Sequence, residues 1–190
     1  DGGLTLRFAE PDGKFETSPG HLDELSAVAA FSCVTNGAPS GIDALKQKDR
    51  FLLVGASSTN AAGAEATYVV MASPGKAGRK PVFYARWHPA GAPVPMPGLN
   101  LDLVPAGKPG EVRVYLRGKP IGGIAAVLRL PDEREREVAA DAEGFLRFTS
   151  DQKGLHQIRI ARHRETIAGF HQGREHDVTS HNACLTWIQP

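Results

Sequence analysis

The chain has 190 residues, with 22 Lys and Arg against 21 Asp and Glu, so its formal net charge is only +1. Charges of both signs are interspersed, which argues against the concentrated basic face that nucleic-acid binding needs. No apolar run approaches the roughly 20 residues that span a bilayer as a helix. The 21 Gly and 14 Pro residues are typical of a turn-rich β protein. The composition therefore predicts an all-β chain that neither binds nucleic acid nor spans a membrane.

Short apolar or alternating runs in the first half predict strands bounded by turn residues. These runs lie at residues 4–8, 31–36, 51–57, 66–73 and 81–88. The last two, ATYVVMAS and PVFYARWH, predict a hairpin whose tip is the basic segment 74–80. Residues 21–26 are predicted to form a short helix, with an extended loop leading into a strand as the alternative, and residues 57–66 are predicted to form a loop.

The segment PAGAPVPMPG at 89–98 holds four prolines and two glycines. Proline cannot donate a hydrogen bond to a strand ladder and it stiffens the chain, so this segment predicts a boundary between modules. We place that boundary near Pro97. The chain then divides into an N-terminal β module at 1–97 and a second β module at 98–190.

The second half alternates more regularly than the first. Leu99, Leu101 and Leu103 share one face of a predicted strand, and EVRVYLRG repeats the pattern at 111–118. Further strands are predicted at 125–130, 145–150, 155–163 and 179–188, and the charged segment 131–144 is predicted to be a connection. Short alternating strands separated by turns are the pattern of an antiparallel β-sandwich. We therefore predict an all-β fold of two antiparallel β-sandwich modules.

The second module resembles the transthyretin-like or carboxypeptidase-regulatory-like sandwich. The residues that carry this resemblance are VRVYLRGKPIGGIAAVLRL, DAEGFLRF and GLHQIRIARH. In such modules a strand runs into Gly-Lys-Pro, and an Asp-x-x-Gly turn leads into a later strand. The resemblance implies a fold and says nothing about activity.

A second resemblance spans nearly the whole chain. RFAEPDGKFETSPGHLDEL, FYARW, and RHRE with SHNACLTW are similar to the DUF4198 family, extracytoplasmic bacterial proteins once described as subunits of nickel uptake systems. The resemblance implies a periplasmic or secreted protein whose partner is a metal ion or a membrane transport component. It also implies a His-Phe-like segment ahead of Asp1.

Five of the seven histidines lie between positions 156 and 181. In an extended strand His163 and Glu165 project from the same face, and a hairpin return would bring His181 alongside them. Imidazole nitrogen and carboxylate oxygen together suit a borderline divalent ion such as nickel, copper or zinc. These three positions also match the recurring pattern of the DUF4198 family near this end. They are the candidate metal ligands.

A polar network without metal is the alternative for the same residues, because His163 and His181 could pair with Glu165, or with Asp177, at a strand end. His156 alternates with Ile158 and Ile160, which predicts a place in the core. Two further histidines, His171 and His176, are predicted to lie in a solvated loop.

The chain has no nucleophile elbow, phosphate loop or zinc-finger spacing, and no local signature orders its serines and histidines. We therefore expect a non-enzymatic protein that binds or delivers a transition metal ion. The alternative is a structural or protein-interaction module that pairs through an exposed strand edge or the aromatic FYARW hairpin. The two cysteines, Cys33 and Cys184, are compatible with a disulfide or with two buried thiols.

Overall fold

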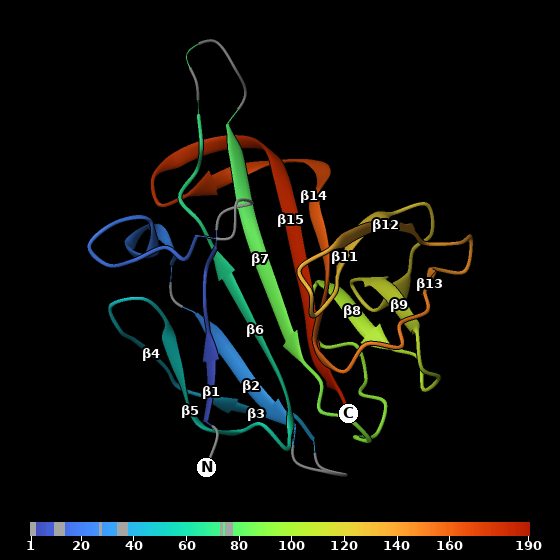
Figure 1. Ribbon diagram of the computed structural model, residues 1–190. Helices are drawn as coiled ribbons and strands as arrows, with labels where there is room; N and C mark the ends of the chain where they lie inside the picture. Colours follow the sequence, from blue (N-terminus) through green and yellow to red (C-terminus); the bar gives the residue numbers. More distant parts are fainter. Residues whose placement is uncertain (1–2, 10–13, 27, 34–37, 73, 75–77) are drawn as a thin grey trace.

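The computed structural model describes residues 3–9, 14–26, 28–33, 38–72, 74 and 78–190 (Figure 1). The described residues form strands and one 3-10 turn, with no α-helix among them. The strands of the first half are β1 (Gly3–Leu6), β2 (Ala29–Cys33), β3 (Ser40–Ile42), β4 (Ala44–Lys46), β5 (Phe51–Ser57), β6 (Ala61–Thr67) and β7 (Arg79–Trp87). The strands of the second half are β8 (Leu101–Pro105), β9 (Glu111–Leu116), β10 (Lys119–Pro120), β11 (Ala125–Arg129), β12 (Glu135–Ala139), β13 (Phe145–Arg147), β14 (Gly154–His171) and β15 (Arg174–Gln189).

One large sheet runs through both halves of the chain, in the order β12-β11-β14-β15-β7-β6-β2-β3. All neighbours in it are antiparallel except β15 and β7, which run parallel. The predicted module boundary near Pro97 falls between β7 and β8. The sheet therefore crosses that boundary through hydrogen bonds between β7 and β15.

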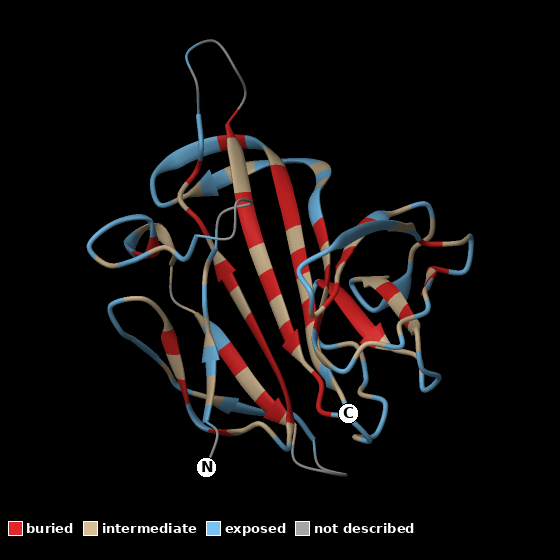
Figure 2. Cartoon of the chain, in the orientation of Figure 1, coloured by how far each residue is buried: buried red, intermediate tan, exposed pale blue. Residues whose placement is uncertain are grey.

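Smaller sheets cover opposite ends of the large one. Strands β8, β9, β10 and β13 form the second layer of the C-terminal half, with β9 at the centre. A core of side chains such as Leu103, Val114, Leu128, Ile158 and Leu185 fills the space between the layers, and each is at most 1% exposed (Figure 2). The sheets pack face to face, as the sequence predicted, so the all-β sandwich fold is confirmed.

The N-terminal layer is a three-stranded sheet in the order β1-β5-β4. It packs against β2 and β6 through a smaller apolar cluster that includes Ala30, Leu53, Ala56 and Ala64. β2 and β6 contribute the small side chains of Ala30 and Ala64 to this cluster. The core of this half is accordingly smaller than the core of the C-terminal half.

A buried ion pair fastens β7 to β8. Arg86 and Asp102 have side chains only 1% and 0% exposed, and the guanidinium donates two hydrogen bonds, of 2.8 and 2.5 Å, to the carboxylate. The same carboxylate accepts from the backbone N–H groups of Gly98 and Leu99. The alternation in LNLDLVP had put Asp102 on the outer face of its strand, and its pairing with Arg86 explains why it is buried.

Several sequence-based predictions of local structure are wrong. The predicted loop at 57–66 contains most of β6, and the charged connection at 131–144 contains β12. The short helix predicted over 21–26 is confirmed only in its first part, as a 3-10 helix over His21–Glu24. Parts of the predicted strand at 31–36 and of the basic hairpin tip at 74–80 lie outside the described residues.

The two cysteines are free thiols. Cys33 lies on β2 and Cys184 on β15, and β7 and β6 run between these strands. Three strand spacings amount to at least about 14 Å, whereas disulfides need Cα atoms within about 7 Å. The disulfide alternative therefore does not fit this fold. Burial raises the pKa of the Cys184 thiol.

Within the described residues, no helix has the length and apolar character needed to cross a membrane.

Candidate metal site

The candidate site lies toward the hairpin end of β14 and β15. These two strands extend well past the second layer and form the long arm at the top of Figure 1. Figure 2 shows that burial gives way to exposure toward the tip of this arm. The predicted ligands therefore lie where the covered core ends.

A bulge in β14 sets the register of the site. Ile160 pairs with Ala183 and His163 pairs with His181, so one extra residue is accommodated on β14 between the two pairs. Arg162 lies within this irregularity at a φ of 59°, a conformation that β-bulges use. Because of the extra residue, His163 rather than Arg162 stands opposite His181.

His181 is the most deeply buried of the three predicted ligands, at 4% exposed. Its Nδ1 lies 2.8 Å from the Tyr84 hydroxyl, and the two rings stack with centroids 5.8 Å apart. Its Nε2 lies 2.8 Å from Oε2 of Glu165, but this nitrogen is buried and makes no aligned hydrogen bond. One ring nitrogen therefore has the Tyr84 hydroxyl as its partner, while the other lies at ion-pair distance from the Glu165 carboxylate.

Glu165 is held by Arg117, which reaches it from the turn after β9. Two guanidinium nitrogens donate hydrogen bonds of 3.0 and 2.6 Å to the two carboxylate oxygens. These hydrogen bonds, with smaller contributions from the charge of Arg117 and from His181, hold the pKa of Glu165 below its ordinary value. The carboxylate is therefore ionised at neutral pH.

His181 and Tyr84 are neutral at neutral pH. Burial lowers the pKa of His181 and outweighs the opposing effect of Glu165. Burial, with the negative charge of Glu65, raises the pKa of the Tyr84 hydroxyl far above its ordinary value. A neutral imidazole with a free lone pair is the form that binds a metal ion.

The structure brings His163, Glu165 and His181 together on one face, although not as a complete coordination sphere. The rings of His163 and His181 have centroids 6.3 Å apart. Two imidazoles on one zinc ion would have centroids about 5–6 Å apart, given Zn–N distances of about 2.0–2.1 Å. Across the described part of the chain, no group of three or more His, Cys, Asp or Glu side chains stands ready to hold an ion. A rotation of His163 would be needed.

The other clustered histidines differ in their surroundings. His156 is fully buried, as expected, and both ring nitrogens have partners. His176 was predicted to be solvated, but it is 2% exposed and its Nδ1 contacts the carbonyl oxygen of Ile167. The prediction failed because the segment was taken for a loop, whereas it continues β14 and β15.

Sequence reasoning missed Tyr84 and Arg117. The FYARW run showed that Tyr84 and Arg86 share a face, but the partner of that face depends on the parallel pairing of β7 with β15. No local sequence pattern indicates that two strands separated by about half the chain pair in parallel. Arg117 follows β9 in a turn with a φ of 49°, and nothing in its neighbours indicates a contact with Glu165.

The chain matches no protein-family model, no curated protein and no solved structure. The resemblances to the DUF4198 family and to transthyretin-like modules therefore stay predictions.

Proposed function

We propose that this protein binds a divalent transition metal ion, nickel, copper or zinc, through His181 and Glu165, with His163 as the third ligand. The observation that carries the proposal is the buried Nε2 of His181, which faces a carboxylate oxygen at 2.8 Å without an aligned hydrogen bond. A buried polar atom without a partner is uncommon in native proteins.

The tautomer of His181 explains why a cation suits this position. When Nδ1 carries the ring proton, it donates to the Tyr84 hydroxyl oxygen, and Nε2 turns its lone pair toward Glu165. Two electron-rich atoms then face each other, and a cation between them removes the repulsion. Donor atoms of one tetrahedral zinc ion stand about 3.3 Å apart, so only a small opening of the 2.8 Å contact is required.

Tyr84 and Arg117 would influence the bound ion in opposite directions. Tyr84 fixes the ring orientation and tautomer of His181, as hydrogen-bond partners of metal-binding histidines commonly do. Arg117 neutralises Glu165 and competes with the ion for its oxygens. The arrangement favours an ion that is held reversibly, which is consistent with a periplasmic or secreted protein that delivers metal to a membrane transport component.

Calorimetric titration of the metal-stripped protein with zinc, nickel and copper salts at neutral pH tests the proposal. We expect saturation near one ion per chain for at least one of these metals. The double variant His163→Ala/His181→Ala should lose this binding. His21→Ala is the matched control, because the His21 side chain is 58% exposed and lies in the 3-10 turn of the N-terminal half. Absence of binding to folded wild-type protein, or equal binding by the double variant, would reject the proposal.

The tip of the β14–β15 hairpin favours a second candidate, a protein-interaction module. Phe170 is 77% exposed and Ile167 is 40% exposed. Arg162 and Arg164 lie exposed on the same hairpin, and neither forms an ion pair within the described residues. Apolar and cationic groups together suit an acidic partner with an apolar contact.

The aromatic FYARW run fits this second role less well. Phe83 packs edge-on against Phe8 and Tyr68, and Tyr84 is 3% exposed.

We expect immobilised wild-type chain to retain a partner that Phe170→Ser loses and that high salt releases. Equal retention by Phe170→Ser would exclude the hairpin tip as the contact.

A further inference from the structure

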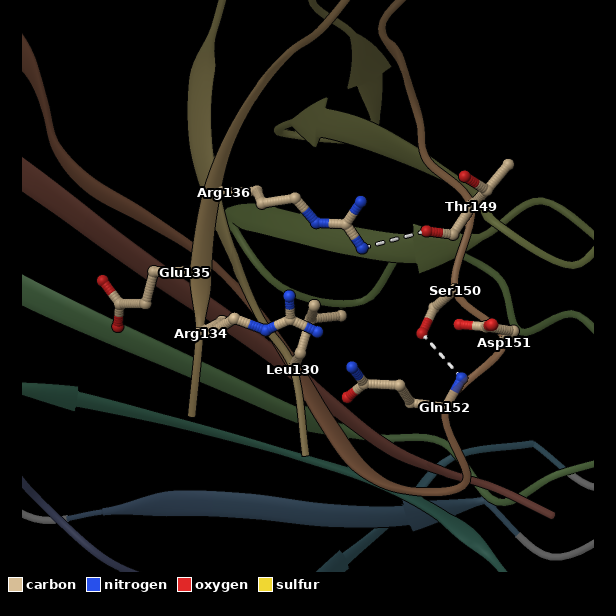
Figure 3. A pocket seen from close by; sticks show the side chains of 8 residues that line it. All are labelled: Leu130, Arg134, Glu135, Arg136, Thr149, Ser150, Asp151 and Gln152. Atoms are coloured by element: carbon tan, nitrogen blue, oxygen red, sulfur yellow. Dashed lines mark hydrogen bonds between the residues drawn. The ribbon is translucent and has the colours of Figure 1, made fainter. Parts of the chain in front are cut away.

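A second arrangement of polar side chains lies at the other end of β14. An open hollow of about 640 Å³ lies between the start of β12 and the loop that joins β13 to β14 (Figure 3). Ser150 and Gln152 line it from the loop. Arg136 lines it from β12, and Arg134 lines it from the turn before that strand. This hollow shares no residue with the candidate metal site.

Ser150 forms a hydrogen bond with a histidine at the inner side of the loop. Its Oγ lies 2.8 Å from Nε2 of His156, and the Nδ1 of that ring lies 3.1 Å from the carbonyl oxygen of Gly154. A carbonyl oxygen can only accept, so Nδ1 carries the ring proton and Nε2 presents its lone pair to the Ser150 hydroxyl. Ser150 therefore donates to His156, and the imidazole is already in the tautomer that a general base needs.

Packing and a backbone carbonyl fix the orientation of the His156 ring. The ring is completely buried and stacks on the indole of Trp187, with centroids 5.1 Å apart and planes 21° apart. The Gly154 carbonyl accepts the hydrogen bond from Nδ1 and holds the ring in this orientation. A nucleophile, a base and a group that orients the base are the three parts of an activated hydroxyl.

Arg136 supplies positive charge beside Ser150. Its guanidinium donates a 3.1 Å hydrogen bond to the carbonyl oxygen of Thr149, the residue before Ser150. Other arginines nearby are neutralised, Arg134 by Asp132 and Arg159 by Glu135, whereas Arg136 has no carboxylate partner in the described portion of the chain. Its remaining N–H groups are therefore free to stabilise negative charge that develops on a carbonyl oxygen.

We propose that Ser150 is a nucleophile activated by His156 and that the hollow accepts a short carboxylic ester. Oγ forms a bond to the acyl carbon while its proton moves to Nε2 of His156, and the bond to the leaving alkoxide breaks as that alkoxide takes up the proton. Water then attacks the acyl group in the same way, releasing the carboxylic acid and restoring Ser150. An ester carbonyl that enters this open hollow meets the Ser150 hydroxyl and the Arg136 guanidinium. This proposal departs from the expectation of a non-enzymatic chain.

A fluorophosphonate probe and p-nitrophenyl acetate test this proposal on the whole protein. We expect the probe to modify Ser150, located by mass spectrometry of the digested chain, at least about 100-fold faster than other serines, because a positioned base contributes about 10²–10⁴-fold. We also expect a burst of p-nitrophenol close to one equivalent per chain. Ser150→Ala should abolish both signals.

Ser57 provides the internal comparison, because its hydroxyl contacts Thr59 at 2.8 Å and no imidazole. A His156→Gln variant should slow modification of Ser150 while leaving that of Ser57 unchanged. If this variant does not fold, the contrast between Ser150 and Ser57 in wild-type protein still decides the question. Equal modification of the two serines, or no modification of Ser150 in folded protein, would overturn the proposal and leave the Ser150–His156 contact as a structural tie.

Discussion

Two buried imidazoles lie on the same face of the β14–β15 ladder, at the two ends of its covered apolar stretch, and they differ in one nitrogen. Both nitrogens of His156 have hydrogen-bond partners, the Ser150 hydroxyl and the Gly154 carbonyl. His181 has the Tyr84 hydroxyl on Nδ1, but its Nε2 faces Glu165 without an aligned hydrogen bond. The first arrangement suits transfer of a proton from a hydroxyl group. The second arrangement suits a cation.

The stretch between them explains why the polar partners of the two imidazoles lie at its ends. Ile158, Ile160, Ala183 and Leu185 are at most 3% exposed and pack against the second layer. A polar side chain in that stretch would lose its water without gaining a partner. At either end, loops and neighbouring strands can supply partners, and those partners decide what each imidazole can do.

The largest effect is expected from a change that weakens the fold around both imidazoles together. Asp102→Ala would leave the buried Arg86 without its carboxylate, and loss of one partner of a buried pair costs about 3–5 kcal/mol. We expect a fall of that size in the free energy of unfolding, measured by urea denaturation, with β7 and β8 losing their link. A loss below about 1 kcal/mol, the range of an exposed pair, would mean that the Arg86–Asp102 pair does not hold the layers together.

The next-largest effect, on metal affinity, should distinguish the His181 site from the Ser150–His156 pair. Tyr84→Phe removes the hydroxyl that orients His181, and such changes lower metal affinity about 10–100-fold. Ser150→Ala, at the other end of the ladder, should leave metal affinity unchanged. Calorimetric titration of both variants measures the difference. Equal weakening in both would show that the two ends are coupled through the core.

A smaller change of opposite sign is expected for Arg117→Met. The Arg117 side chain is 49% exposed, so its ion pair with Glu165 is worth no more than about 1 kcal/mol. Removing this competitor should tighten metal binding by up to about fivefold, with little change in the free energy of unfolding. Weaker binding by this variant would indicate that Arg117 holds Glu165 in place for the ion.

The least specific test of the difference between the two imidazoles is the pH dependence of stability. Burial lowers the pKa values of His88 and His181 in the folded protein. As the pH falls below about 6.5, the unfolded chain binds protons that the folded chain does not, so stability falls with the pH. Urea midpoints measured with a chelator from pH 8 to pH 5 should decline, and less steeply in His181→Gln. A midpoint that rises on acidification would contradict the inferred burial effect.

The sequence predicted the apolar framework well because alternation follows from burial of one strand face. EVRVYLRG and LNLDLVP became β9 and β8, with Leu101, Leu103 and Val114 in the core. Segments with small or charged residues carried no such signal, so β6 and β12 were not predicted. Alternation detects apolar burial and little else.

The candidate sites depended on features that alternation does not encode. The pairing of His163 with His181 requires the bulge at Arg162, because a regular ladder would have placed His163 on the opposite face. The Ser150–His156 pair arises because a short loop turns back onto β14. The bulge and the loop both depend on backbone geometry that no residue pattern in the chain indicated.

Nitrogen NMR of protein labelled with ¹⁵N-histidine, recorded before and after addition of one equivalent of zinc at neutral pH, tests the contrast between the two imidazoles most directly. We predict that the Nε2 resonance of His181 shifts while both nitrogens of His156 keep their positions. A shift at His156, or no shift at His181 in folded protein, would contradict the assignment of cation binding to the hairpin end of the ladder.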